Sequence, residues 1–134
     1  MRISHFFIDR PIFAAVVSIV IVILGILAAV AIPKYIDLKN DAAQAAVNGV
    51  GGALSSAMAV NYAARTANSA KGSAVANCTD GAALLQGGAL PTQGGAYVIT
   101  AAAVAVGASV SCTLTFTPTG GTAVTSTFTA IGIA

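Results

Sequence analysis

The feature that most constrains this chain is an uninterrupted apolar segment, residues 11–32, close to the N-terminus. It contains no charged residue, and Ser18 is its only polar side chain. As an α-helix, these residues would rise about 33 Å, which matches the roughly 30 Å hydrocarbon core of a bilayer. The basic residues Arg10 and Lys34 flank the segment, where their side chains can reach the interface. The sequence therefore predicts a helix that spans a membrane or forms the centre of a protein assembly.

Two other interpretations of this segment stay open. A cleaved signal peptide has an apolar core of about 7–15 residues before small residues, and Ala28, Ala29 and Ala31 resemble such a cleavage site. A helix buried inside a soluble domain is the other interpretation, although the remainder of the chain is too small to surround it. The length of the apolar run favours a retained membrane segment.

Charge is unusually scarce along the whole chain. Charged residues make up 7 % of the sequence, and none of them is a glutamate, whereas a typical domain has about a quarter. The basic residues form no cluster, so charge by itself does not predict nucleic-acid binding. A weakly charged surface also allows copies of the chain to associate with little electrostatic opposition.

The helix is expected to continue beyond the apolar segment to about Ala64. Pro33 removes one intrahelical hydrogen bond, so we expect a kink near it. Beyond it, apolar residues recur at helical spacing, and Gly49, Gly51 and Gly52 are expected weak points. The face predicted to pack on a head domain carries Val47, Val50, Leu54 and Met58, and the opposite side carries Lys39, Asn40, Gln44, Asn48 and Ser55.

The last half of the chain changes from helical to strand patterning. Turn-forming residues recur over 66–91, with a short helix expected at 81–86. Apolar and polar residues alternate over 109–117 and again over 123–130, and 97–100 is a third strand candidate. The ambiguous segment 101–108 is also assigned as a strand. The predicted fold class is therefore α+β, in which a small antiparallel sheet of three or four strands is covered by the amphipathic half of the long helix.

Cys78 and Cys112 are the only cysteines, and both follow the apolar segment. If this part of the chain is exported, a disulfide is the expected state, and two reduced buried thiols are the alternative. Basic residues lie on both sides of the apolar segment, so their distribution does not decide the orientation. The cysteine pair favours a C-terminal domain outside the cell.

Residues that carry catalytic chemistry are sparse. The one histidine is His5, and Asp80 is isolated in the second half of the chain. The sequence contains no phosphate-binding loop, zinc-protease helix or nucleophile motif. Asn77 begins a three-residue glycosylation pattern, which is weak evidence by itself. We predict that the chain is not an enzyme and that it uses no cofactor and no metal.

The motif GILAAVAIPKY at 25–35, followed by IDLKNDAAQAA, closely resembles the N-terminal helix of bacterial type IV pilins. The order of alanine-rich helix, loop, antiparallel sheet and cysteine pair is also similar to that family. The resemblance implies a kink-forming role for Pro33 and a structural disulfide between Cys78 and Cys112. The spacing of Gly25 and Ala29, like that of Ala14 and Ser18, also suits close helix packing.

The first 24 residues resemble a different family, the resistance-nodulation-division efflux pump subunits, through the sequence FFIDRPIFAAVVSIVIVILG. Counted back from Pro33, the leader glycine, phenylalanine and glutamate of pilins fall on Pro11, Ile12 and Val16, and none of them matches. The charge pairing that pilins use between neighbouring subunits is therefore unavailable at Val16. Both resemblances imply a cytoplasmic N-terminus followed by an exported domain.

Together these resemblances imply a lead at 1–10 in the cytoplasm, a transmembrane or filament-core helix at 11–32, and an exported pilin-like head at 33–134. The implied function is a structural subunit of a type IV pilus-like filament, first anchored in the inner membrane and then extracellular at the cell surface. Its implied partners are copies of itself, the inner membrane and the pilus assembly machinery. The alternatives are a membrane-anchored domain that does not polymerise, a pseudopilin of a secretion system, or a small module that binds DNA or another ligand.

Overall fold

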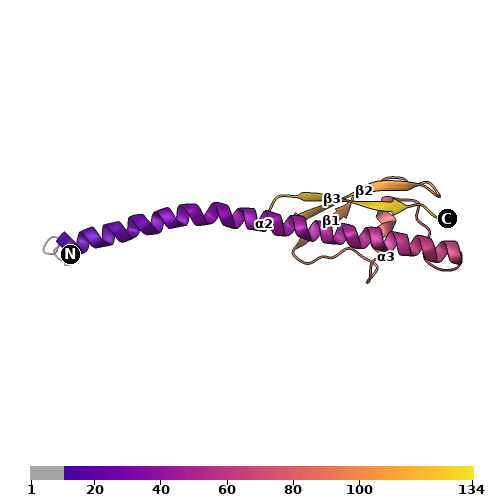
Figure 1. Cartoon of the computed structure of the whole chain (residues 1–134), viewed down its shortest axis with the longest axis horizontal. Helices are drawn as coiled ribbons and strands as arrows, with labels where there is room; N and C mark the ends of the chain where they lie inside the picture. The colour runs from indigo at the N-terminus through magenta and orange to yellow at the C-terminus, as the bar shows by residue number, and fades with distance from the viewer. Residues whose placement is uncertain (1–10) are drawn as a thin grey trace. The chain divides into compact units, whose positions relative to one another are not determined.

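The computed structural model describes the backbone of residues 11–134 and the side chains of residues 12–29 and 38–134. The predicted cytoplasmic lead, residues 1–10, lies outside the described residues. The chain forms two compact units, Met1–Leu38 and Lys39–Ala134. One helix, α2 (Pro11–Ala67, 57 residues), contributes to both units (Figure 1).

Helix α2 begins and ends at residues that suit helix termini. Pro11 is the first helical residue, where its missing N–H group is not required. Ala67 is the last, three residues beyond the predicted end, and the Asn68 side chain then accepts a hydrogen bond from the backbone of Ala70 at 2.9 Å. Helical structure is continuous through position 33. The expected kink falls among residues 30–37, whose side chains are outside the described set, and it stays a prediction.

The head contains a three-stranded antiparallel sheet in the order β1-β2-β3. Its strands are β1 (Gly95–Ile99), β2 (Ser109–Pro118) and β3 (Val124–Ile131). In the register, Tyr97 lies opposite Phe116, and Cys112 lies opposite Phe128. Strands that follow one another in the sequence are therefore neighbours in the sheet. The bounds predicted for these three strands, 97–100, 109–117 and 123–130, agree with the observed ones within two residues.

The strand predicted at 101–108 is wrong. After β1, the chain leaves the sheet and pairs with the loop that precedes the short helices. The backbone N–H of Val104 donates to the carbonyl of Ala76 at 2.8 Å, and Cys78 N–H donates to Ala102 at 2.9 Å. Only isolated bridges form, at Ala103 and Val106. Backbone hydrogen bonding is therefore satisfied by a distant loop, which the alanine-rich local sequence does not reveal.

The predicted short helix is also shorter than expected and has two parts. A 3₁₀ turn, η1 (Cys78–Asp80), leads directly into α3 (Gly81–Leu84). Leu85 is extended, with φ −69° and ψ 155°, so the helix stops before the predicted end. Gly87 and Gly88 then adopt φ values of 104° and 71°, a region that favours glycine.

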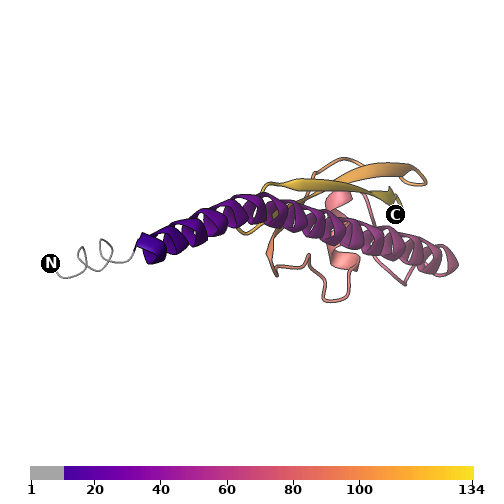
Figure 2. The same cartoon turned by 60° about the vertical axis from the view of Figure 1, so that its left-hand side comes forward.

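The head core lies between α2 and one face of the sheet (Figure 2). Val47, Leu54 and Met58 on α2 are fully buried, and Val50 is partly buried against the same cluster. The sheet contributes apolar residues that alternate with outward-facing threonines and serines, as a half-buried strand requires. The main sheet residues of the core are Ile99, Cys112, Leu114, Phe116, Phe128 and Ala130.

Gly51 has a packing role that the sequence analysis did not anticipate. A Cβ atom at this position would lie 3.2 Å from Ser126 Oγ and 3.4 Å from the carbonyl oxygen of Thr127. The missing side chain therefore allows the backbone of α2 to approach β3 closely. Gly49 and Gly52 have no atom within 4 Å of such a Cβ, so no comparable contact explains them.

Candidate assembly surface

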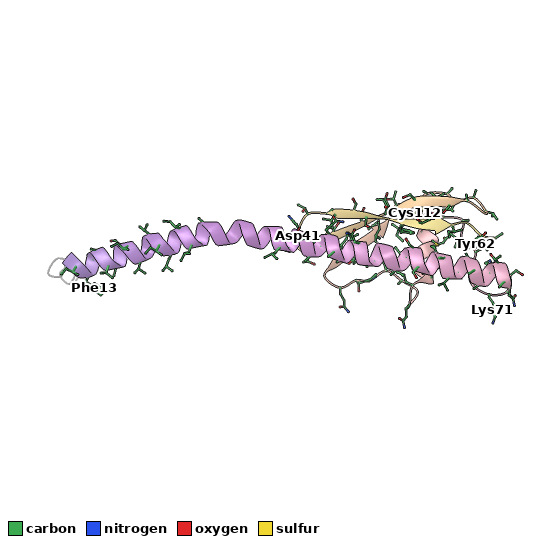
Figure 3. The ribbon with its side chains drawn as sticks, viewed as in Figure 1. Phe13, Asp41, Tyr62, Lys71 and Cys112 are labelled. Carbon is green, nitrogen blue, oxygen red and sulfur yellow. A yellow bond between two sulfur atoms is a disulfide. The ribbon has the colours of Figure 1, made fainter. Side chains whose placement is uncertain are left out.

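The first unit presents an apolar helical surface that its own chain does not cover. The segment Ile12–Ala29 has a mean hydropathy of 3.1, and none of it is buried. Side chains project from all sides of the helix (Figure 3), with Ile12 80 % exposed and Leu27 60 % exposed. By length and composition, this helix is able to cross a membrane. An apolar surface of this size needs lipid or other protein chains around it.

Small residues gather on one face of this helix. At 3.6 residues per turn, Ala14, Ser18, Gly25 and Ala29 fall within a sector of about 60°. A Cβ atom at Gly25 would have no neighbour within 4 Å. Ser18 Oγ donates to the carbonyl of Ala14 at 2.9 Å, so its hydroxyl needs no water. The face is therefore suited to the close approach of a second helix.

The opposite face of the same helix is bulky. Ile12, Val16, Ile19 and Ile23 occupy it, and each is at least half exposed. Val16 is 53 % exposed and contributes no charge. Among the described residues, 12–29 present only apolar and small side chains. The helix therefore has a small face and a bulky face, which differ in how closely a neighbour can approach.

In the head, the polar side of α2 holds the sheet through hydrogen bonds. Lys39 Nζ donates to the carbonyls of Thr119 and Gly120, at 3.1 and 3.0 Å, in the turn that joins β2 to β3. Two cationic hydrogen bonds thus hold this turn against the helix. The helical pattern places Lys39 on the side away from the core, and its side chain is indeed exposed. The pattern does not predict its hydrogen bonds to the turn.

Two more polar residues of α2 cover the outer edge of β3. Gln44 Nε2 donates to the carbonyl of Thr125 at 3.0 Å, and Ser55 Oγ accepts from the N–H of Thr129 at 3.2 Å. These backbone groups face away from β2, so the helix side chains replace a missing neighbouring strand. From the sequence, Gln44 and Ser55 were expected on the side opposite the apolar stripe, whereas they border it and are partly buried. Their partners lie more than 70 residues away.

The predicted disulfide between Cys78 and Cys112 is confirmed. It joins η1 to the central strand β2, with a Cα–Cα distance of 5.8 Å, and both residues are buried. Asp80 accepts from the N–H groups of Ala76 and Asn77, at 2.9 and 2.8 Å. The carboxylate and the disulfide therefore hold the same loop from two sides.

Asn77, the first residue of the glycosylation pattern, has a structural role. Its Oδ1 atom accepts hydrogen bonds from Thr79 N, Thr79 Oγ1 and Ala102 N, at 3.2, 3.1 and 3.3 Å. It thereby caps η1 and links the loop to the segment after β1. The side-chain oxygen is fully used in this arrangement.

A shallow groove on the head lies between α2 and residues 84–86. Its volume is about 510 Å³, and small residues such as Ala53 and Ala57 line it with Val60 and Asn61. Asn61 is 6 % exposed, and its side chain is satisfied by the backbone of Ser73 through two hydrogen bonds of 2.8 Å. In the part of the chain with described side chains, no buried polar side-chain atom lacks a partner. The buried polar side chain of the groove, Asn61, is therefore already satisfied, and Ser56 and Gln86 contribute exposed polar side chains to its lining.

No candidate metal site is found where side chains are described, since no three His, Cys, Asp or Glu residues gather there. Comparisons of this chain with protein-family models, curated proteins and solved structures found no match.

Proposed function

We propose that this chain is a structural subunit of a type IV pilus-like filament and polymerises through its N-terminal apolar helix. The observation that carries the proposal is the segment Ile12–Ala29, apolar throughout and not buried by its own chain. Its apolar surface is stable only in lipid or against other apolar helices. A filament core made of copies of this helix satisfies the second condition.

Two environments follow from the proposed function. Before assembly, the helix lies in the inner membrane, where its internal hydrogen bonds satisfy every backbone group within the lipid. During assembly, helices of neighbouring copies replace the lipid. The small face formed by Ala14, Ser18, Gly25 and Ala29 brings two helices close enough for extensive van der Waals contact.

The composition of the head is compatible with a tightly packed array. Residues 81–134 contain no charged residue and no histidine. The remainder of the head, residues 39–80, contains three basic and two acidic residues, so its net charge is small, and heads that are brought together by a helical core meet little like-charge repulsion. The disulfide between Cys78 and Cys112 supports a loop that faces solvent in the proposed filament. The resemblance of residues 25–46 to type IV pilins supports the same assignment.

A second function is favoured by the residue at position 16. Pilins carry a glutamate there for pairing between subunits, whereas Val16 is uncharged. A chain without this pairing remains a single-span anchored head that does not polymerise. A pseudopilin of a secretion system, assembled with other subunits, belongs to the same structural class.

The deciding experiment is electron microscopy of cells that express the full chain, with mass spectrometry of filaments sheared from the surface. Fibres that contain this chain are the expected result, and the N-terminal peptide identifies any processing before Pro11. If no fibres form and the intact chain stays in the membrane fraction, the proposal of a filament subunit is refuted and that of an anchored head that does not polymerise is supported.

A matched pair of variants tests the helix face. Gly25→Leu keeps the segment apolar and adds bulk to the small face, where no atom of its own chain lies within 4 Å. We expect it to retain membrane insertion and to lose filaments. Val16→Leu adds one methylene on the bulky face and serves as the control, with filaments retained. Normal filaments from Gly25→Leu would contradict helix packing through this face.

A further inference from the structure

The two edges of the head sheet differ in how their backbone groups are satisfied. The β3 edge is covered by Gln44 and Ser55, as described above. At the β1 edge, Thr100 N donates to Thr113 O and Thr119 N donates to Gly94 O, both at 3.0 Å. These bonds establish which residues of β1 face β2.

Hydrogen bonding alternates along an antiparallel pair, so Ala96 and Val98 share the inward phase with Thr100 and Gly94. The N–H and C=O groups of Gly95, Tyr97 and Ile99 consequently point away from β2. Among residues 12–29 and 38–134, no hydrogen bond reaches these outward groups. Edge β1 is therefore an unpaired template for another strand.

This edge also lacks the usual protection against pairing. Natural edge strands commonly carry lysine, proline or a bulge that prevents another strand from adding. β1 reads GAYVI, has no such residue, and pairs with β2 in continuous register. Val98 is 59 % exposed on the solvent face. Residues 81–134 contain no charged residue, and the nearby ammonium group of Lys39 is held by the carbonyls of Thr119 and Gly120 in the β2–β3 turn.

We propose that the β1 edge pairs antiparallel with β1 of a second copy of this chain, about a two-fold axis at Tyr97. In this register, Tyr97 lies opposite Tyr97 of the partner subunit, and Gly95 lies opposite Ile99 of the partner subunit. Each outward donor on one strand then meets an outward acceptor on the other. The strand is thus self-complementary in its hydrogen bonds, which is the requirement for an isologous interface.

A second copy suits this edge better than a charged partner does. Strand β1 is uncharged in both copies, so pairing along it brings no like charges directly opposite each other and offers no counter-ion to a charged peptide. Pairing also stops at two copies, because α2 covers the β3 edge of each sheet. The interface therefore gives one six-stranded sheet shared by two copies, and it does not extend into a fibre.

This inference goes beyond the proposed function. The helix-mediated assembly builds one filament, whereas β1 pairing joins heads that belong to neighbouring filaments or to separate anchored chains. Each β1 edge is used once, so each head joins one other head, and contacts of this kind associate filaments side by side.

Register-specific cross-linking of the full chain in detergent micelles tests the pairing. On the solvent face, Ala96 of one copy is placed opposite Val98 of the partner subunit, in a pair with a Cα–Cα distance near 4.5 Å. This spacing suits a disulfide. We expect a mixture of Ala96→Cys and Val98→Cys chains to form disulfide-linked dimers on mild oxidation, and each variant alone to form none, because its cysteine then faces a residue that is not cysteine.

A cysteine on the covered edge provides the control. Thr125→Cys is exposed on β3, and mixed with Val98→Cys it is expected to form no cross-link. Equal cross-linking of this control pair, or none with the Ala96→Cys and Val98→Cys pair, overturns the proposal. Because the cross-links lie in the heads, association of the apolar helices alone does not produce the register-specific result.

A charge exchange at the same two exposed positions provides an independent readout. A96K/V98K places like charges directly opposite each other at two sites per dimer, whereas A96K/V98E places opposite charges there. We expect sedimentation to show head dimerisation weakened roughly five- to tenfold by the first variant and retained by the second. Equal behaviour of the two variants contradicts the register.

Electron microscopy of cells expressing the same cysteine variants separates this inference from the proposed function. Filaments without register-specific cross-linking overturn β1 pairing and leave the filament subunit standing. Cross-linked heads without filaments support β1 pairing and favour the anchored chain. Filaments that associate side by side, and lose that association in A96K/V98K, support both the β1 pairing and the filament function.

Discussion

Replacing both cysteines by alanine, C78A/C112A, removes the covalent link between η1 and the central strand. The two residues are 34 positions apart, and the chain-entropy relation for a loop of that length gives a loss of about 4 kcal/mol. Both side chains are buried, at 0 and 1 % exposure. Alanine is therefore chosen and not serine, which would bury a hydroxyl group without a hydrogen-bond partner. A domain of this size has a total unfolding free energy of about 5–15 kcal/mol. The expected loss is thus a large share of the stability of the head.

Guanidinium unfolding of the full chain in detergent micelles measures this loss. The chain has no tryptophan and three tyrosines, and Tyr97 stacks on Phe116 with ring centroids 4.2 Å apart. Near-ultraviolet circular dichroism therefore reports the head core, while the apolar helix remains in detergent. Thr127→Ala, an exposed substitution on β3, is the control and is expected to stay within about 0.5 kcal/mol of the parent.

The single variants provide the refuting comparison. C78A and C112A each open the same loop, so each is expected to cost about as much as the double variant. The two single losses are therefore strongly non-additive. If they summed to the loss in the double variant, or if the double variant lost less than about 1 kcal/mol, loop closure would not be the source of the stabilisation.

Three further predictions concern the head and use the same unfolding assay. Leu54→Ala removes a fully buried side chain and should cost about 2–5 kcal/mol; Val60→Ala, 66 % exposed in the parent, is its control, and equal losses would contradict the assigned core. Gly52→Ala places its methyl group in open space and should stabilise the head by up to about 1 kcal/mol. In contrast, the methyl group of Gly132→Ala would collide with a neighbouring backbone carbonyl and should destabilise the head by about 1–3 kcal/mol. If Gly132→Ala were the more stable of the two variants, the close approach at Gly132 would be refuted. Asp80→Ala leaves two backbone N–H groups without their acceptor and should cost about 1–3 kcal/mol, and a loss below about 0.5 kcal/mol would show that water replaces the carboxylate.

Local sequence patterns predicted which face of each element is apolar. The spacing of Val47, Leu54 and Met58 identifies a helical stripe, and the alternation around Cys112 and Leu114 identifies a half-buried strand. Both patterns arise from the geometry of a single element, with 3.6 residues per helical turn and two per strand repeat. They therefore require no knowledge of the rest of the chain.

The partners of the backbone hydrogen bonds could not be predicted in the same way. Residues 101–108 are rich in alanine and valine, which permits a strand, but their partners are the loop around Ala76 and Cys78 and, for residues 106–108, Gly132 after β3. Gly51 reads as a weak helical position until β3 is placed beside it. Local composition states what a segment is able to do, whereas its neighbours determine which of those options satisfies its backbone.

The sequence by itself determined the long apolar helix, the amphipathic stripe and the α+β class, because hydrophobic periodicity depends only on local geometry and on burial. Tertiary structure decided that Lys39 holds a turn about 80 residues away and that Gln44 and Ser55 cover one edge of the sheet. It also decided that the β1 edge remains open. These outcomes depend on which distant backbone groups are brought within hydrogen-bond distance, and the free energy of those contacts is set by the assembled fold and not by any local pattern.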